Sequence, residues 1–491
     1  MTFQIYNTAS RSLEEFQPIE PGKARMYHCG PTVYSSPHIG NFRSFLMADL
    51  LGRHLRARGY EVTQVMNITD VGHLTEDDIE QGEDKMLAAA RAEKLDPYEV
   101  ARKYEAEFVE SAGILGFDLD NYVMPRATEH IAEMQEIIQG LLDSGHAYAV
   151  GNGDVYFSIG NFDRFGRLSG KVLDDLESGA RVAIVDDKRD PRDFALWKTD
   201  EKHLMQWDAP WGRGFPGWHI ECSAMSRRYL GDQFDVHTGG EDNLFPHHEC
   251  EVAQSECFTH KQPFVKYWMH CRHLLVNGEK MSKSKGNFYT IQDLLDKGYK
   301  GEEIRLALIN VHYRKPMNFT LEGIEEGRAW MERVRDCRAR LVRIREGLEN
   351  AGNDDVGDLL ATQREAFGAG LDDDLNIAAA LAAVSGLVTE LNKKTPSSAS
   401  AGVALALFGE FEDWIGCLGA EPVVEKSESG ILWGGDAEDP RRADLLTKAA
   451  AREAARASKD WAEADRLRDE IQTSGFRLVD TPDGSRLDPI S

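Results

Sequence analysis

The sequence predicts a multidomain protein that is α/β in its first part and helical in its second. Its 491 residues exceed what a single hydrophobic core organises, so two to four domains are expected. Near the N-terminus, short apolar strands flank a helix, which is typical of a parallel sheet. After about residue 316 the pattern becomes strongly helical, and the chain closes with a helical stretch followed by FRLVDTPDGSRL.

The α/β prediction depends on three consecutive segments. RMYHC (25–29) is a short strand, followed by the breaker-rich GPTVYSSPHIGN. FRSFLMADLLGRHLRARG (42–59) places apolar residues at helical spacing and stops at Gly59. EVTQVMNIT (61–69) is then a second strand. This βαβ unit predicts a Rossmann-type parallel sheet that binds its ligand at the carboxyl ends of the strands.

Changes in amino-acid composition and in the predicted secondary structure divide the rest of the chain into domains. Two polar stretches of small residues, KKTPSSASAG and EKSESGILWGGDAEDP, are interpreted as a loop and an interdomain linker. The predicted domains are a Rossmann-type domain in two halves (1–115 and 206–275), an inserted module of short strands and turns (116–205), a segment with a basic loop (276–315), a helical bundle (316–424) and a small C-terminal domain (425–491).

Composition narrows the class of protein. The N-terminus lacks the basic head and apolar run of a signal peptide, and no apolar run approaches the roughly 18–20 residues of a membrane span. Seven scattered cysteines without an export signal favour buried thiols over a disulfide framework. We therefore expect a cytoplasmic protein that does not bind membranes.

A net charge of −26 means that any contact with nucleic acid needs a local basic face. GRAWMERVRDCRARLVRIREG (327–347) is one candidate, because it carries seven arginines against few acids. The equal alternative is a solvated helix whose arginines form ion pairs within the protein.

Two separated motifs suit phosphate binding. PHIGN (37–41) follows a strand and opens a helix, where backbone N–H groups and the helix dipole favour an anion. His38 could donate to a phosphate, and Gly40 allows a ligand close to the backbone. NGEKMSKSKGN (277–287) carries Lys280 and Lys283 among serines, which suits the charge of a leaving pyrophosphate. An exposed basic loop is the alternative, but the pairing with PHIGN favours phosphate chemistry.

PHIGN and KMSKS resemble the two signature motifs of class I aminoacyl-tRNA synthetases, HIGH and KMSKS. CGPTVY, NITDV, DFALWK, GWHIECSAMS, GGEDNLFPHHE and KDWAEADRLRDEI are similar to the cysteinyl-tRNA synthetase family, in the family's order and across nearly the whole chain. One departure is Asn41, which stands where the signature has its second histidine. Its amide can still donate a hydrogen bond to a phosphate or ribose oxygen. The resemblance implies a class I synthetase fold.

GGEDNLFPHHECE (239–251) concentrates potential metal ligands. His247 and Glu251 lie four residues apart, on one helix face, and can bind one ion together. His248, Glu249 and Cys250 are expected to point elsewhere. Zinc needs about four ligands, often from distant segments, and spacing alone leaves buried free cysteines as an alternative. The zinc ligands that the resemblance implies, for one ion per chain, are Cys29, Cys222, His247 and Glu251.

The resemblance also implies further site residues. The catalytic residues would be His38, Lys280 and Lys283. The ATP-binding residues would be Gly40, Asn41, Asp242 and Lys283, with Mg²⁺ accompanying the nucleotide. The cysteine-binding residues would be Thr69, Trp218 and His237, although Trp218 and His237 could equally be core residues.

The implied activity is that of a ligase with ATP, L-cysteine and tRNA(Cys) as partners, acting as a monomer. Cysteine would be activated to its adenylate and transferred to the 3′ end of the tRNA. Binding of the substrate thiolate to zinc would exclude serine without an editing domain. Two alternatives are a cysteine ligase that transfers to an amino-sugar amine, which should lack the terminal anticodon-type segment, and a non-catalytic RNA- or zinc-binding paralogue.

Overall fold

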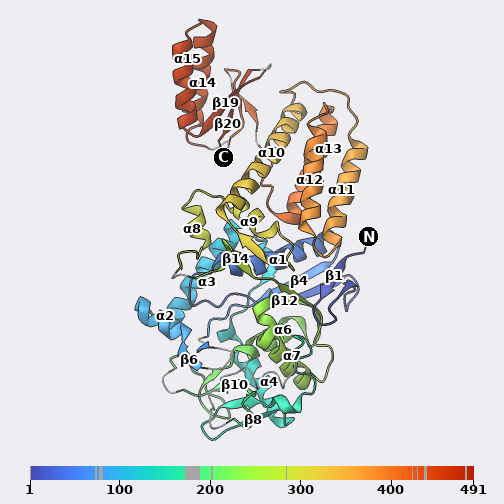
Figure 1. Ribbon diagram of the computed structural model, residues 1–491, viewed down its shortest axis with the longest axis vertical. Coiled ribbons are helices and arrows are strands. Elements are labelled where there is room, and N and C mark those ends of the chain that lie inside the picture. The colour runs from blue at the N-terminus through green and yellow to red at the C-terminus, as the bar shows by residue number, and fades with distance from the viewer. Residues whose placement is uncertain are drawn as a thin grey trace. The chain divides into compact units, whose positions relative to one another are not determined.

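The computed structural model describes residues 2–71, 74–76, 81–171, 188–200, 203–282, 285–422, 424–427, 429–435, 439–481 and 484–490. The chain forms two compact units (Figure 1). One comprises 1–320 with 372–375, and the other 321–371 with 376–491. Among the described residues, no helix combines the length and apolar character that crossing a lipid bilayer requires.

The first unit is built on a five-stranded sheet of order β13-β12-β3-β4-β7, in which every pairing is parallel. The strands are β3 (Lys23–His28), β4 (Glu61–Met66), β7 (Tyr122–Val123), β12 (Phe234–Gly240) and β13 (Val265–Cys271). Helix α1 (Ile39–Ala57) connects β3 to β4 and stops before Gly59, whose φ of 86° ends the helix. The predicted βαβ unit and parallel sheet are confirmed.

Because parallel strands end at the same edge, the segments that follow β3, β4 and β12 meet there. Helix α1 is fixed beneath this edge by a fully buried ion pair, in which Asp49 Oδ2 accepts from Arg305 Nη2 at 2.6 Å. In the described residues of this unit, the other α-helices are α2 (Lys85–Glu93), α3 (Pro97–Ile114), α4 (Ile131–Asp143), α6 (Trp218–Leu230), α7 (Glu249–Thr259), α8 (Ile291–Leu295) and α9 (Gly301–Ile309).

A second sheet, four-stranded and antiparallel, lies within the predicted insertion and continues into the residues after it. Its strands are β8 (Ala147–Ala149), β9 (Val155–Phe157), β10 (Phe194–Lys198) and β11 (Phe215–Pro216). Phe157 and Trp197 of this sheet belong to the same hydrophobic core as Cys29, Cys222 and Cys250. The insertion therefore helps to enclose the region where the candidate metal ligands lie.

A three-stranded sheet carries the lysine-rich loop. It consists of β14 (Leu274–Val276), β15 (Glu279–Lys280) and β16 (Met317–Phe319), with β14 in the centre. Two hairpins complete the first unit: β1 (Gln4–Asn7) with β2 (Ser12–Glu15), and β5 (Leu74–Glu76) with β6 (Gln81–Asp84).

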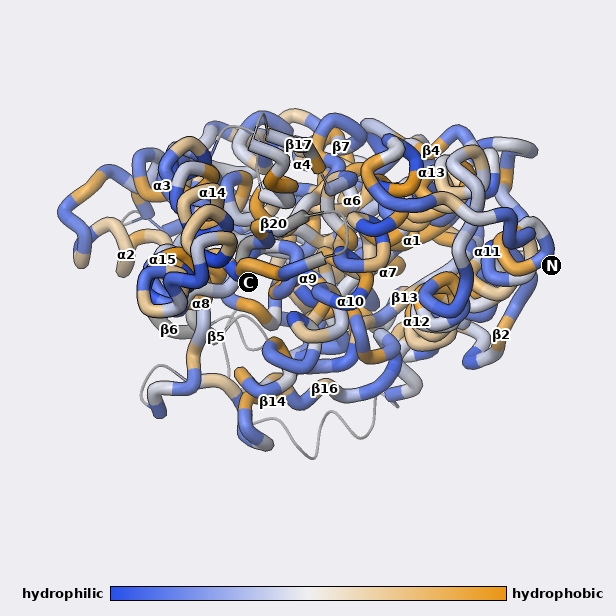
Figure 2. The backbone as a smooth tube through the Cα atoms, turned by 90° about the horizontal axis from the view of Figure 1, so that it is seen from above, coloured by the Kyte–Doolittle hydropathy of each residue, from blue (hydrophilic) through white to orange (hydrophobic). Residues whose placement is uncertain are grey.

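The second unit confirms the predicted helical region. It begins with α10 (Leu321–Arg345), α11 (Gly357–Asp372), α12 (Ile377–Leu391) and α13 (Ser398–Ile415). A smaller part follows with β17 (Glu425–Lys426), β18 (Leu432–Trp433), α14 (Arg442–Ala457), α15 (Trp461–Thr473), β19 (Phe476–Thr481) and β20 (Gly484–Pro489). Helix α15 is largely hydrophilic along its length (Figure 2).

Two interpretations of polar stretches were wrong in part. The stretch interpreted as a loop already contains the start of α13, because the Ser397 side chain accepts from Ser400 N–H and caps that helix. The stretch interpreted as an interdomain linker contains β18, which pairs with β20. Ile431 and Trp433 are buried in the core of the C-terminal part. A two-residue strand is too short to show an alternating pattern.

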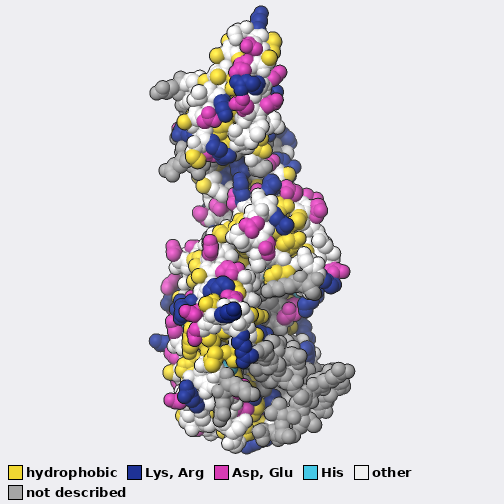
Figure 3. Space-filling view, turned by 90° about the vertical axis from the view of Figure 1, so that its left-hand side faces the viewer, with side chains coloured by type: hydrophobic (Ala, Val, Ile, Leu, Met, Phe, Trp, Pro, Cys, Tyr) yellow, Lys and Arg dark blue, Asp and Glu magenta, His cyan; other side chains and the backbone are white. Residues whose placement is uncertain are grey.

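Two arginines of α10 bind groups within the protein, as the alternative interpretation of this helix expects. Arg338 Nη1 donates to Leu418 O at 2.7 Å, and Arg340 Nη1 donates to Leu391 O at 3.0 Å. These side chains bind backbone carbonyls of the bundle rather than facing a ligand. Basic and acidic side chains are also interspersed on the surface in Figure 3. A continuous basic face along this helix is therefore not supported.

Candidate active site

Two adjoining cavities lie at the carboxyl edge of the parallel sheet. The first, of about 670 Å³, is lined by the segment after β3 and by Thr69, Trp218, Cys222 and His247. The second, of about 500 Å³, is lined by Gly40, by residues 271–275, and by Lys280 and Met281. The residues that line both are Cys29, Gly30, His38, Asn41, Asp242 and Asn243. The two cavities thus share one wall formed by the PHIGN motif and the segment after β12.

The four predicted metal ligands converge at the base of the first cavity. One ligand atom from each of Cys29, Cys222, His247 and Glu251 lies within 4.8 Å of the others, and all four residues are buried. Cys29 follows β3, Cys222 lies in α6, His247 in the kinked segment η6 (Leu244–His248), and Glu251 in the first turn of α7. The fold therefore gathers segments that are far apart in the sequence around one point.

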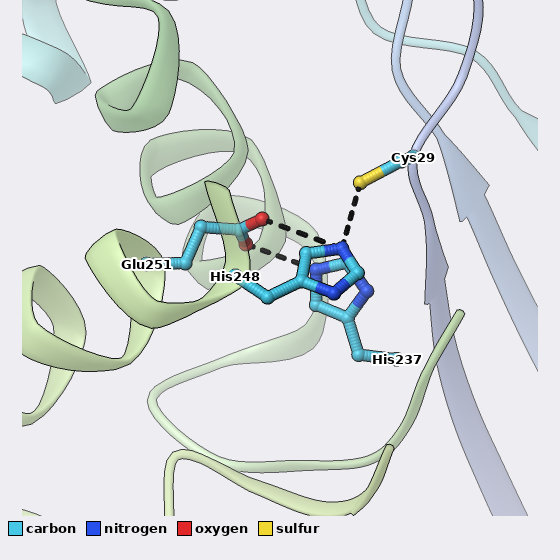
Figure 4. Close-up of side chains that lie close together, drawn as sticks. All are labelled: Cys29, His237, His248 and Glu251. Atoms are coloured by element: carbon cyan, nitrogen blue, oxygen red, sulfur yellow. Dashed lines mark hydrogen bonds and ion pairs between the residues drawn. The ribbon is translucent and has the colours of Figure 1, made fainter. Parts of the chain in front are cut away.

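A second set of four ligand atoms overlaps the first, in which His237 and His248 replace Cys222 and His247 (Figure 4). His248 Nε2 lies 3.2 Å from Cys29 Sγ, and His237 Nε2 lies 2.9 Å from Glu251 Oε2. The expectation that His248 points elsewhere was wrong. It considered only the i, i+4 pair, whereas His248 has a helical backbone and lies three residues before Glu251, and residues i and i+3 of a helix also share a face.

The first set fits a zinc ion better than the second. Two thiols, an imidazole and a carboxylate are the donor types of zinc sites. Cys29, Cys222 and His247 also line the first cavity, whereas His237 and His248 are not among the residues that line either cavity. Glu251 Oε1 is buried and, within the described part of the chain, makes no hydrogen bond of regular geometry, and its neighbour is His247 Nε2 of the same set, 3.1 Å away. That oxygen is suited to a cation in the cluster.

The electrostatics of the cluster also suit a cation. A hydrogen bond that the Cys222 thiol donates to Cys29, together with burial, raises the pKa of Cys222 well above its usual value, and burial raises the pKa of Cys29. Burial opposes ionisation of Glu251, but His237 and His247 outweigh it and lower its pKa to about 2. The protein alone therefore holds neutral thiols beside a carboxylate. Binding of a divalent metal would release the thiol protons.

Neighbouring side chains orient the residues of the first cavity. His247 Nδ1 lies 3.0 Å from His219 Nδ1, and the Trp218 ring lies 4.4 Å from the His247 ring. Thr69 Oγ1 donates to Glu221 Oε2 at 2.9 Å, which fixes its hydroxyl. Thr69 and Trp218 both line the first cavity. Sequence reasoning missed His219 and Glu221, although both lie in the GWHIE motif.

His237 does not line the first cavity as Thr69 and Trp218 do. It is fully buried, and its ring stacks on Trp268 with centroids 4.7 Å apart and an interplanar angle of 17°. Its Nε2 faces Glu251 rather than either cavity. His248 Nδ1 in turn lies 2.8 Å from His270 Nε2, behind the cluster. The structure therefore places His237 where it can orient a metal ligand.

The first turn of α1 gives Asn41 a structural role. Asn41 Oδ1 accepts from the His38 backbone N–H at 3.1 Å, and Asn41 N–H donates to His38 Nδ1 at 3.2 Å, a reciprocal capping box. Ile39 N–H donates to Tyr289 O at 3.0 Å. Two N–H groups predicted to face an anion are therefore already bonded, and the helix end has less to offer phosphate than the motif suggests.

Gly40 is closely packed against two side chains. A Cβ atom there would lie 2.7 Å from Met281 Cε and 3.0 Å from His38 Cε1. Met281, in the KMSKS motif, thus lies against the PHIGN motif. Lys280 lines the second cavity with Asp242. Lys283 lies outside the described residues.

Comparisons with known proteins agree with this architecture. The family model for the class I (C) tRNA synthetase catalytic domain matches residues 15–329, and that for the DALR domain matches 366–420. Two similar structures are Mycobacterium tuberculosis methionyl-tRNA synthetase with methionyl-adenylate (16% identity, TM-score 0.56, 80% of this chain and 89% of that one) and an Agrobacterium radiobacter K84 LeuRS–tRNA–LeuAMS complex (14%, 0.56, 96% of each). Sheet, site and matches together define a class I aminoacyl-tRNA synthetase.

Full-length relatives identify the branch of that class. The chain is 43% identical to a cysteine–tRNA ligase of Symbiobacterium thermophilum and 42% identical to one of Thermus thermophilus, in each case over 99% of both chains. It belongs to the cysteine–tRNA ligase family.

Proposed function

We propose that this protein activates L-cysteine with ATP and transfers the cysteinyl group to the 3′ end of tRNA(Cys). The observation that supports it most is the arrangement of the two cavities. A thiol-rich set of metal ligands, Cys29, Cys222, His247 and Glu251, converges at the base of the first cavity, and the first three line it. The second cavity, lined by both signature motifs, adjoins it through a shared wall.

In this proposal the first cavity binds cysteine. A zinc ion held by the four ligands would stabilise the substrate thiolate, which a serine hydroxyl cannot replace because it ionises far less readily. Thr69 and Trp218 line the same cavity and would contact the rest of the amino acid. His237 would act behind the cluster, through its contact with Glu251.

The second cavity would bind ATP with Mg²⁺. Gly40 admits close approach to the backbone, Asp242 would accept from the ribose, and His38 and Asn41 would contact the phosphates or ribose. A cysteine carboxylate oxygen forms a bond to the α-phosphorus while the bond to the bridging oxygen breaks and pyrophosphate leaves. Lys280 and Lys283 would balance the charge that develops on pyrophosphate.

The second step moves the cysteinyl group to RNA. A hydroxyl of the terminal ribose attacks the carbonyl carbon, AMP leaves with the bonding electrons, and the hydroxyl proton passes to solvent. No protein nucleophile is needed, because positioning and electrostatic stabilisation supply the catalysis.

Residues 425–491 would bind the anticodon region. Trp461, at the first position of α15, is 59% exposed, so it does not anchor the small core of this part. An exposed aromatic ring can stack on an unpaired base. We further propose a monomer that acts in the cytoplasm, and light scattering on the purified protein tests the monomer.

Cysteine-dependent exchange of pyrophosphate into ATP, followed by charging of tRNA(Cys), tests the proposal. We expect exchange with cysteine and no RNA, and charging when tRNA is added. Exchange without charging would favour a smaller acceptor, and neither reaction would indicate a non-catalytic paralogue.

A further inference from the structure

Helix α1 carries a buried arginine two residues after the PHIGN motif. Arg43 is 3% exposed, and its guanidinium donates to backbone carbonyls rather than to a carboxylate. The four bonds are Nη1 to Arg272 O (2.9 Å), Nη1 to His273 O (2.9 Å), Nη2 to His312 O (3.3 Å) and Nη2 to Lys315 O (2.7 Å). Only a planar fork of several donors can bind such a set at once.

These carbonyls belong to the two turns that lead into the three-stranded sheet. Residues 272–273 connect β13 to β14, and residues 312–315 precede β16. Strand β14 pairs with β16 on one side and with β15, which ends at Lys280, on the other. Arg43 therefore binds the base of the hairpin that carries the KMSKS motif.

A second charged side chain, Glu241, also binds the turn formed by residues 272–273. Glu241 Oε1 accepts from the His273 N–H at 2.8 Å, and Glu241 Oε2 pairs with Arg272 Nη1 at 2.8 Å. Glu241 also lines the second cavity beside Asp242. The turn is thus fastened to α1 through its carbonyls and to the segment after β12 through its N–H.

The 312–315 turn is fastened independently. Asp374 Oδ1 accepts from the Tyr313 hydroxyl at 2.5 Å, and Asp374 Oδ2 accepts from Arg314 Nε at 2.6 Å. Both turns therefore have a rigid support, and they are joined to each other by Arg272 N–H to Tyr313 O at 2.8 Å and by Met317 N–H to His273 O at 3.2 Å. Arg43 binds this joined pair of turns to α1.

The cost of burying this charge indicates that the link matters. Burial lowers the pKa of Arg43, so the cation is kept in place by its four bonds to carbonyl oxygens. At the other end of the hairpin, Met281 packs on Gly40, one turn of α1 before Arg43. Helix α1 and the hairpin are thus in contact at two points, one at the motifs and one at the hairpin's base.

We propose that Arg43 is a positioning residue that holds the Lys280 hairpin in register with the PHIGN motif, over the cavity assigned to ATP. It is not among the residues that line either cavity, so it would act through the hairpin. This inference rests on the proposed function, because the step it serves is adenylate formation.

The test compares R43K and R43Q with R53Q. Arg53 lies on the same helix and also donates to a carbonyl, Gly116 O, and to Asp49, but not to either turn. At saturating ATP, we expect R43K to form cysteinyl-adenylate about 100-fold more slowly, since a misplacement of about 1 Å costs that much. Zinc content and cysteine affinity should not change. R53Q should stay within about threefold of the unmodified protein.

Hydrogen exchange supplies a readout that general destabilisation would not move. R43K should speed exchange in 272–281 and 312–319 and leave β3 and α7 unchanged. If R43Q does not fold, E241Q replaces it, with an expected loss of about tenfold in the same step. The proposal is overturned if R43K forms adenylate within threefold of the unmodified protein, or loses zinc and adenylate formation together. If the unmodified protein forms no adenylate, the proposed function fails, whereas the exchange pattern still tests the link.

Discussion

Replacing Cys222 or Cys250 with serine separates a metal ligand from a neighbouring core thiol. Both side chains are buried, at 2% and 1% exposure, and both belong to the same hydrophobic core. Of these two cysteines, Cys222 belongs to one of the two sets of converging ligands found in the described residues, and Cys250 belongs to neither. The two variants are therefore matched in residue type and burial, and they differ in contact with the metal site.

The two substitutions are expected to change different quantities, the metal affinity for Cys222→Ser and the free energy of unfolding for Cys250→Ser. Loss of a residue that merely supports a ligand costs 10–100-fold in metal affinity, so loss of the Cys222 thiolate should cost at least about 100-fold, or about 2.8 kcal/mol. Cys250→Ser should leave the metal affinity unchanged. A hydroxyl in that apolar core should instead lower the free energy of unfolding by about 1–3 kcal/mol.

A competing chelator makes the difference measurable. At a chelator concentration that leaves the unmodified protein half loaded, a 100-fold weaker site would hold metal in about 1% of molecules. We expect Cys222→Ser to be nearly empty under these conditions and Cys250→Ser to remain half loaded. Equal loss of zinc in both variants, or retention in Cys222→Ser, would refute the assignment of ligands.

Three further predictions concern catalysis and RNA binding. Lys283→Ala should slow adenylate formation about 10²–10³-fold in pre-steady-state assays with little change in cysteine affinity, because the lysine is assigned to charge that develops during reaction; a loss of cysteine affinity alone would contradict that role. Removal of 425–491 should leave pyrophosphate exchange nearly intact and reduce tRNA charging by orders of magnitude; a truncated protein that charges normally would exclude this part from recognition. Trp461→Ala should weaken tRNA binding by about 1–3 kcal/mol in a filter-binding assay without changing thermal stability, and the reverse pattern would return Trp461 to the core.

Periodic patterns made the first part of the fold predictable. Residues 42–59 are long enough to show helical spacing, and the strands on each side are apolar, so the βαβ unit follows directly. The two residues of β18 contain no such period. Only the tertiary contacts of Ile431 and Trp433 reveal that this segment is part of a core rather than a linker.

The sequence predicts those parts of the candidate site whose residues lie close together in the chain. The i, i+4 spacing pairs His247 with Glu251, but Cys29 and Cys222 join them only through the resemblance and the fold. His248 was expected to point elsewhere because only the i, i+4 spacing was considered, although residues three apart also share a helix face. The bonds of Arg43 could not be anticipated at all, since its acceptors are backbone carbonyls, which any residue type can supply.

The ratio of ATP–pyrophosphate exchange with cysteine to that with serine tests the central claim most directly. Shape alone would separate these two substrates by about 10–200-fold, corresponding to 1–3 kcal/mol. If a metal-bound thiolate sets the selectivity, exchange should favour cysteine by well over 200-fold, and removal of zinc should reduce activity with cysteine. A preference within the range of shape alone, or one unaffected by zinc removal, would contradict the account.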